Sequence, residues 1–259
     1  MYPNPSQHDP YGQRDPYGQR NPYGPSFAPG GPSIDPRATL ASGVDQFMSR
    51  VNTWMAAGVG LTGLVAWLIS TSPAALALVF GTPLIWVAIF APLVFVFVIA
   101  GRVHKMNPGT ATAMFLIYAA INGVSLASIF ILYSLGSIAL VFATTAVMYG
   151  SLALWGYATK RDLSAWGKFL FMGLIGLIVS GLLFMFFPSM MGSTMYLVYN
   201  VIGVLIFAGL TAYDTQKIKQ IYLVNGGAGN LAIQGALTLY LDFINLFLFL
   251  LRLFGGSRD

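Results

Sequence analysis

The chain has 259 residues, of which 56% are apolar and only 8% are charged, and its mean hydropathy is +0.72. This balance excludes an ordinary soluble domain and predicts a membrane protein. Because the chain has no cysteine, a disulfide framework and a thiolate metal site are excluded as well. The net charge of +5 does not indicate nucleic-acid binding, since no basic stretch is interleaved with aromatic residues.

The N-terminal segment differs in composition from the rest of the chain. DPYGQR occurs at 9–14 and again at 15–20, and NPYGPS follows. A repeat rich in Pro, Gly and Tyr predicts a disordered tail over residues 1–36, interpreted as a solvated tail in preference to a tether for other proteins. From Leu40 to Val51 apolar residues recur at helical spacing, which predicts a short interfacial helix before the first span.

Apolar stretches long enough to cross a bilayer, which takes about 20 residues of helix, follow the tail. They lie at 51–70, 82–101, 109–133, 136–157, 167–187, 195–215 and 231–254. These stretches predict one all-α membrane domain over residues 37–255, with seven transmembrane helices and a short C-terminal tail at 256–259.

The basic residues predict the orientation of the spans. They precede the first span or follow the second, fourth and sixth, as Arg37, Arg50, Arg102, Lys105, Lys160, Arg161, Lys168, Lys217 and Lys219. The alternate loops contain no Lys or Arg, so we expect a multi-pass protein with a cytoplasmic N-terminus. No organelle-directing segment is visible in the sequence, and we therefore expect the plasma membrane as its location. Arg252 and Arg258 lie near a C-terminus that seven crossings would place outside. A last segment that dips into the membrane and returns is therefore an alternative.

Two aspartates, Asp214 and Asp242, are the only acidic residues inside the long apolar stretches. A carboxylate in such a position needs a partner, a proton or water. The turn-forming sequence NGGAGN at 225–230 contains the midpoint between the two. If the last two spans run antiparallel from this turn, both carboxylates lie at one depth and form an opposed pair in the inner half of the membrane.

Other polar residues recur on single faces of the predicted spans. Because polar groups are costly against lipid, these faces should converge inside the bundle and line a pathway beside the aspartates. For the Asn and Ser residues, hydrogen bonding that only holds helices together is the alternative. The residues concerned are Asn122, Ser125, Thr211, Gln234, Thr238 and Asn245.

Two segments carry a resemblance to a known family. TAYDTQKI at 211–218 and ALTLYLDFINLFLFLLRLFG at 236–255 resemble the paired signatures of the Bax inhibitor-1 family of membrane proteins, and the likeness extends from about Phe47 to Gly255. The resemblance implies six helices around a central seventh and a calcium-leak pathway gated by protons. It implies that Asp214 and Asp242 are the pH-sensing pair and that Arg102 is the basic residue that pairs with Asp214. Because Ca²⁺ prefers oxygen ligands, we expect the two carboxylates to hold Ca²⁺ transiently.

The sequence and the resemblance together predict a pH-sensitive calcium leak channel, not an enzyme, with no cofactor besides the permeant ion. Its partners would be the lipid bilayer, Ca²⁺ and H⁺, and not nucleic acid. One alternative is a modulator that binds membrane proteases or stress-response membrane proteins. An intramembrane aspartyl protease is less favoured: such proteases carry Gly-x-Gly-Asp at the second aspartate, whereas Leu239, Tyr240 and Leu241 precede Asp242 here.

Overall fold

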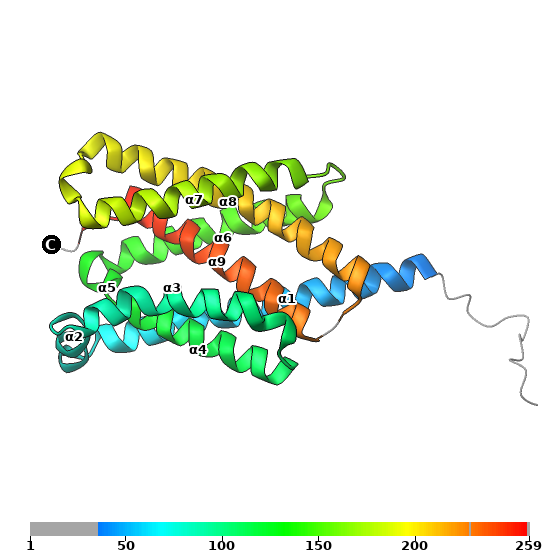
Figure 1. Ribbon diagram of the computed structural model, residues 1–259, viewed down its shortest axis with the longest axis horizontal. Coiled ribbons are helices and arrows are strands. Elements are labelled where there is room, and N and C mark those ends of the chain that lie inside the picture. The colour runs from blue at the N-terminus through cyan, green and yellow to red at the C-terminus, as the bar shows by residue number, and fades with distance from the viewer. Residues whose placement is uncertain (1–35, 228, 258–259) are drawn as a thin grey trace, which may run out of the picture.

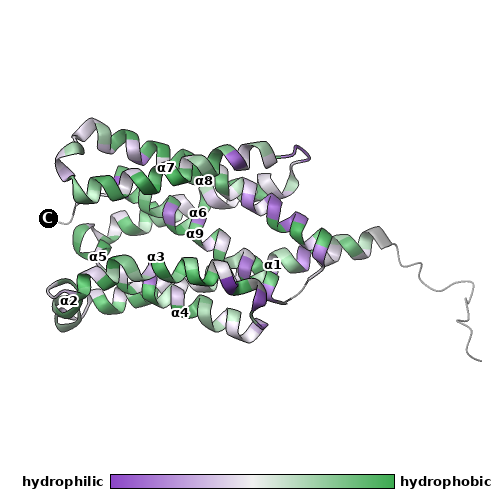
Figure 2. Cartoon of the chain, in the orientation of Figure 1, coloured by the Kyte–Doolittle hydropathy of each residue, from purple (hydrophilic) through white to green (hydrophobic). Residues whose placement is uncertain are grey.

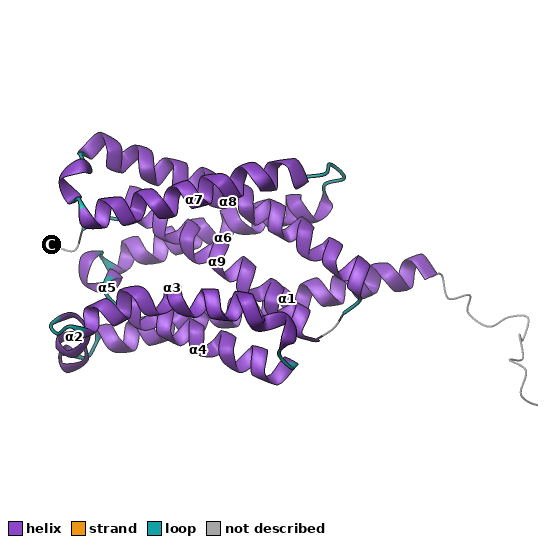
Figure 3. Cartoon of the chain, in the orientation of Figure 1, coloured by secondary structure: helices purple, strands orange, loops and turns teal. Residues whose placement is uncertain are grey.

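The computed structural model describes residues 36–227 and 229–257, so the predicted tail at 1–36 lies almost wholly outside the described part. Within that part the chain forms helices joined by short turns, with no β-strand (Figure 3). In chain order the helices are α1 Pro36–Ser70, α2 Pro73–Phe80, α3 Leu84–Arg102, η1 Val103–Lys105, α4 Pro108–Leu126, α5 Ile129–Leu132, α6 Leu135–Ala158, α7 Ser164–Phe186, η2 Pro188–Met190, α8 Ser193–Asn225 and α9 Gly229–Phe254.

The predicted all-α membrane architecture is confirmed. Among the described residues, six helical segments are long and apolar enough to cross a membrane, namely α1, α4 with α5, α6, α7, α8 and α9. The pair α2 and α3, bent by 78° at the break between them, passes the same test when taken together, which gives up to seven spans by length and composition. α2 was not predicted: its residues lie in the segment before the apolar stretch at 82–101, which was expected to be a loop. That helix begins where the Ser72 hydroxyl accepts a hydrogen bond from the Ala75 amide and Pro73 occupies the first turn.

The first helix is longer than predicted. The amphipathic segment expected to form a separate interfacial helix is continuous with the first span, and α1 runs unbroken for 35 residues. Phe47 and Val51 on this segment are buried, so its apolar face packs into the bundle and does not lie on the membrane surface. No proline interrupts the helix after its first residue, and nothing else in the sequence favours a break at Arg50.

The last helix occupies the centre of the bundle. α9, red in Figure 1, packs against α1, α4, α6 and α8, whereas α7 packs mainly on α8 and α3 mainly on α4. Within the most apolar stretch of 18 residues in each helix, 61% of the residues are buried in α9 but only 11% in α7. α9 is therefore the core of the domain, and α7 faces outward with large apolar side chains suited to lipid.

The two ends of the bundle differ in polarity. Hydrophilic residues gather where α1 begins, where α8 ends, and at the turns after α3 and α6 (Figure 2). We call this the basic end, because Lys160, Arg161 and Lys219 lie there. α9 then runs without a break to the opposite end (Figure 1). The continuous helix does not match the alternative of a last segment that dips in and returns.

Close helix contacts bring α1 and α4 together beside the centre. A Cβ added at Gly123 of α4 would lie 2.7 Å from the Thr62 carbonyl oxygen of α1. Any side chain there would push the two helices apart, so glycine permits this approach. The contact positions Thr62 and Asn122 against α9.

Candidate functional site

Asp214 and Asp242 lie on adjoining helices. α8 and α9 pack along their length after the turn at Gly226, whose φ of 70° suits glycine. Asp242 is buried at 4% exposure, and Asp214 is partly buried. The two carboxylates are near enough to interact electrostatically. The structure therefore brings together the two acidic residues that the sequence singled out.

The Asp242 carboxylate lies in the protein interior. Its Oδ2 is buried with no hydrogen-bond partner within the described residues, and the same holds for the Tyr149 hydroxyl of α6. These two groups also interact electrostatically, and the Tyr149 ring meets Phe243 edge-on at 5.5 Å. Buried polar atoms without partners are uncommon because they are costly. Tyr149 thus joins the site, although only its place in an apolar stretch could have indicated it in the sequence.

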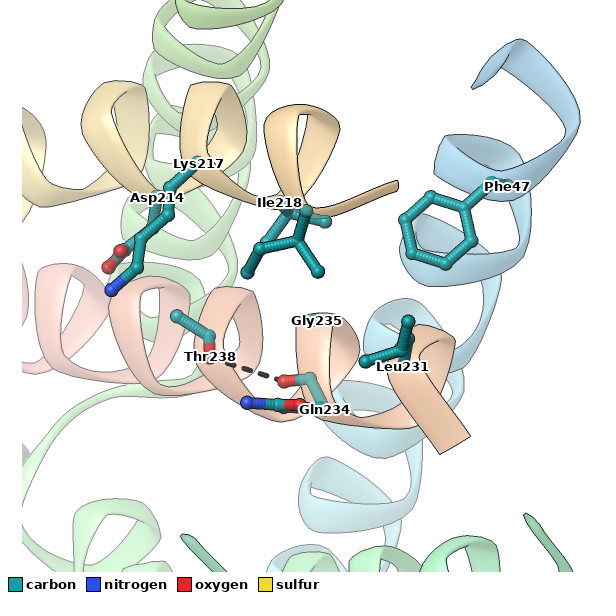
Figure 4. A pocket seen from close by; sticks show the side chains of 9 residues that line it. Phe47, Asp214, Lys217, Ile218, Leu231, Gln234, Gly235 and Thr238 are labelled. Carbon is teal, nitrogen blue, oxygen red and sulfur yellow. Dashed lines mark hydrogen bonds between the residues drawn. The ribbon is translucent and has the colours of Figure 1, made fainter. Parts of the chain in front are cut away.

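A small cavity opens beside Asp214 near the basic end. Its volume is about 60 Å³, enough for a few water molecules. Asp214 and Lys217 point from α8 toward α9, where Thr238 lies (Figure 4). The lining residues are Phe47, Asp214, Lys217, Ile218, Ile221, Leu231, Gln234, Gly235 and Thr238. Asp214 therefore borders a water-sized space of mixed polar and apolar lining, whereas Asp242 is enclosed in the protein interior.

The basic residue beside Asp214 is Lys217. Its charge acts on the Asp214 carboxylate, as expected for residues three apart on one helix face. Arg102, which the resemblance assigned to this role, is exposed at the end of α3 and does not line the cavity. In the sequence Lys217 is interpreted as an inner-loop charge, so its place beside Asp214 is not predicted there.

The predicted pathway residues divide among three surroundings. Gln234 and Thr238 line the small cavity. Asn122, Ser125 and Asn245 line a second cavity of about 610 Å³ between α3, α4, α5 and α9. Thr211 borders neither cavity; it is fully buried, and its hydroxyl donates to the Phe207 carbonyl at 2.8 Å. Thr211 therefore serves its own helix in this conformation.

A hydrogen-bonded cluster fixes α9 just before Asp242. The Tyr240 hydroxyl is 2.7 Å from the Thr62 hydroxyl of α1 and accepts a hydrogen bond of 2.9 Å from the Asn122 amide of α4. The Thr62 hydroxyl is also 2.9 Å from the Ala119 carbonyl, to which it donates. Tyr240 is fully buried. Neither Tyr240 nor Thr62 was predicted as a site residue, because their meeting depends on three helices far apart in sequence.

Comparisons with known proteins agree with this architecture. Residues 44–259 match the family described as inhibitor of apoptosis-promoting Bax1. The inner membrane protein YbhL of Escherichia coli K12 is 43% identical over 233 residues, which cover 87% of this chain and 96% of YbhL. An uncharacterized membrane protein of Streptococcus pyogenes serotype M3 is 39% identical over 220 residues, covering 83% of this chain and 94% of that protein. With a family match over most of its length and relatives at this level of identity, the chain is a multi-pass membrane protein that belongs to the Bax inhibitor family.

Proposed function

We propose that this protein is a pH-sensitive leak channel for cations, with Ca²⁺ as the permeant ion and Asp214 and Asp242 as the proton sensor. The observation that carries the proposal is the pair itself. Two carboxylates interact on adjoining spans, one beside a water-sized cavity and the other buried with an unpartnered oxygen. Carboxylates placed inside a membrane domain in this way mark ion or proton pathways more often than structural contacts.

The pair supports proton sensing through its electrostatics. Two carboxylates in a medium of low dielectric constant do not both ionise readily, so they share a proton and respond as one unit. Loss of that proton adds repulsion between α8 and α9, which a cation relieves. Ca²⁺ takes about six to eight oxygen ligands, and two carboxylates supply too few for permanent storage. They suit transient contact with an ion in transit.

The proposal is tested by Ca²⁺ flux into proteoliposomes, followed with an enclosed dye at pH values between about 5 and 8. Asp214→Asn and Asp242→Asn each keep the side-chain size but cannot change charge. We expect each variant to lose most of the pH dependence of flux. The double variant should be little different from either single one, because the pair titrates as a unit.

A matched control is Asp162→Asn, which makes the same chemical change in the exposed loop between α6 and α7. It should keep the wild-type pH profile. Wild-type profiles in both single variants of the pair would contradict the proposed sensor. Absence of cation flux through the wild-type protein at every pH would contradict the channel itself.

The site argues against an aspartyl protease. Leu239 and Tyr240 are fully buried and Asp242 is 4% exposed, so an extended substrate has no access to the second aspartate in this conformation. Cleavage of a helical substrate in proteoliposomes by the wild type, lost in Asp242→Asn, would favour the protease instead.

The orientation proposed for this function places the basic end in the cytoplasm. The support is the distribution of the Lys and Arg side chains that the structure describes: eight lie at or near that end, and Arg252 lies at the opposite one. The eight are Arg50, Arg102, Lys105, Lys160, Arg161, Lys168, Lys217 and Lys219. Positive charges are enriched on the cytoplasmic side of membranes, and the relative YbhL is named an inner membrane protein. The N-terminus would then be cytoplasmic, in the cell membrane.

A further inference from the structure

The central helix has one face that is not fully buried. Between Ala232 and Leu251, every residue of α9 is buried except five, which are partly exposed: Gln234, Thr238, Leu241, Asn245 and Leu248. Their spacing of four, three, four and three residues places them in one line along the helix. The most buried helix of the bundle therefore has one continuous row of partly exposed residues along its length.

This line borders both cavities. The cavity of about 60 Å³ meets α9 at Leu231, Gln234, Gly235 and Thr238. The cavity of about 610 Å³ meets α9 from Leu241 to Arg252. No residue lines both. Thr238 and Leu241 are consecutive members of the line, so about 4.5 Å of helix rise separates the two cavities on α9.

Three residues line the larger cavity at its limit toward the basic end of the bundle. The lining residue nearest the basic end is Val96 on α3, Tyr118 on α4 and Leu241 on α9. Tyr118 is buried and stacks on Phe95 at 6.4 Å. The basic-end limit of the larger cavity is thus lined by an aliphatic chain from each of two helices and an aromatic ring from a third, and on α9 this limit is one turn from the smaller cavity.

We propose that Val96, Tyr118 and Leu241 form an apolar constriction that separates the two cavities, and that Leu241 is the side chain that closes the ion route in this conformation. The inference rests on the proposed channel function. Narrow apolar constrictions exclude water and thereby block ions without a charged barrier. Leu241 precedes Asp242 in the chain, so a displacement of α9 by the aspartate pair also displaces the constriction.

Thiol accessibility tests the location of the constriction, and does so independently of flux. Because the protein has no cysteine, a single introduced thiol is the only one present. We expect a charged, membrane-impermeant methanethiosulfonate to modify Thr238→Cys from the basic end and Asn245→Cys from the opposite end. Leu241→Cys should react more slowly than either, from both sides. Reaction of the first two from the same side, no reaction of either, or fast reaction at Leu241→Cys would overturn the proposal.

Flux tests the role of Leu241. Leu241→Ala should raise Ca²⁺ flux into proteoliposomes several-fold, and Leu241→Phe should lower it. The matched control is Leu154→Ala, the same truncation at an α6 residue that is 70% exposed on the outer surface; its flux should equal that of the wild type. If the wild type conducts Ca²⁺ and neither Leu241→Ala nor Leu241→Phe changes the flux, the constriction is overturned but the channel proposal stands. If the wild type conducts no cations, the channel proposal itself fails.

Discussion

The Asn122 amide of α4 donates a hydrogen bond of 2.9 Å to the Tyr240 hydroxyl of α9, two residues before Asp242. The Thr62 hydroxyl of α1 is hydrogen-bonded to the same Tyr240 hydroxyl at 2.7 Å. Three spans are thus joined at one buried oxygen next to the candidate proton sensor. Phe115 and Tyr118 pack edge-on against the Tyr240 ring at 5.7 Å each. The cluster fixes the height of α9 relative to α1 and α4, and so the position of Asp242.

Removal of the Tyr240 hydroxyl should destabilise the protein. In Tyr240→Phe the Asn122 amide loses its partner in a buried site, which typically costs about 1 to 3 kcal/mol. Thermal or denaturant unfolding in detergent measures the loss. Tyr196→Phe is the matched control, because the Tyr196 hydroxyl is exposed and its hydrogen bond to the Arg252 carbonyl is long, at 3.4 Å. Equal stability of Tyr240→Phe and the wild type would show that the cluster does not hold α9.

Gln216, in the TAYDTQKI segment, has a structural role. It accepts a hydrogen bond from the Leu163 amide at 2.9 Å and donates one to the Arg161 carbonyl at 2.8 Å. Gln216→Ala should free the α6–α7 loop, lower stability by about 1 to 3 kcal/mol and speed tryptic cleavage after Lys160 or Arg161. The pH dependence of flux should persist.

Gln220→Ala is the matched control for this prediction, since Gln220 is exposed one turn further along α8. Its cleavage rate and stability should equal those of the wild type. Loss of the pH dependence of flux in Gln216→Ala, with an intact loop, would assign Gln216 to the sensor instead.

The Tyr149 hydroxyl should affect function more than stability. It has no hydrogen-bond partner within the described residues, so Tyr149→Phe removes no such bond and should change the free energy of unfolding by less than about 1 kcal/mol. Near Asp242, however, a hydroxyl dipole favours the charged carboxylate. Its removal should move the midpoint of the pH–flux profile toward higher pH. An unchanged midpoint would mean that Tyr149 only packs against Phe243.

Much of the architecture could be predicted from the sequence because a bilayer imposes a minimum apolar length on every span. The same constraint made Asp214 and Asp242 conspicuous. The α2 helix was missed because eight apolar residues are too few for a span and its turn signals resemble those of a loop. Tyr149 was not assigned to the site, since contact between helices depends on packing and not on the spacing within one helix. Lys217 could have been assigned from its spacing of three from Asp214, but was interpreted as an inner-loop charge.

Topology can be checked with two cysteines in this cysteine-free chain. Ser189→Cys lies in η2 and Asn225→Cys at the end of α8, and both positions are exposed. We expect Ser189→Cys to react with an impermeant maleimide from outside intact cells. Asn225→Cys should react only after the membrane is permeabilised, because positive charges are retained in the cytoplasm. Labelling of both from one side would show that α8 does not cross the membrane.

The last prediction concerns the positive charge that acts on Asp214. In this conformation Lys217 lies beside the carboxylate and lines its cavity, whereas Arg102 is exposed at the end of α3. A nearby positive charge favours the ionised carboxylate, so its removal lets the proton remain bound to higher pH. Lys217→Gln should therefore move the midpoint of the pH–flux profile upward, and Arg102→Gln should move it less. The measurement is the same flux assay across about pH 5 to 8, with Lys168→Gln, an exposed residue of α7, as the control for loss of one charge. A larger shift in Arg102→Gln than in Lys217→Gln would mean that α3 approaches Asp214 in the conducting state, and that Arg102 is the counter-charge there.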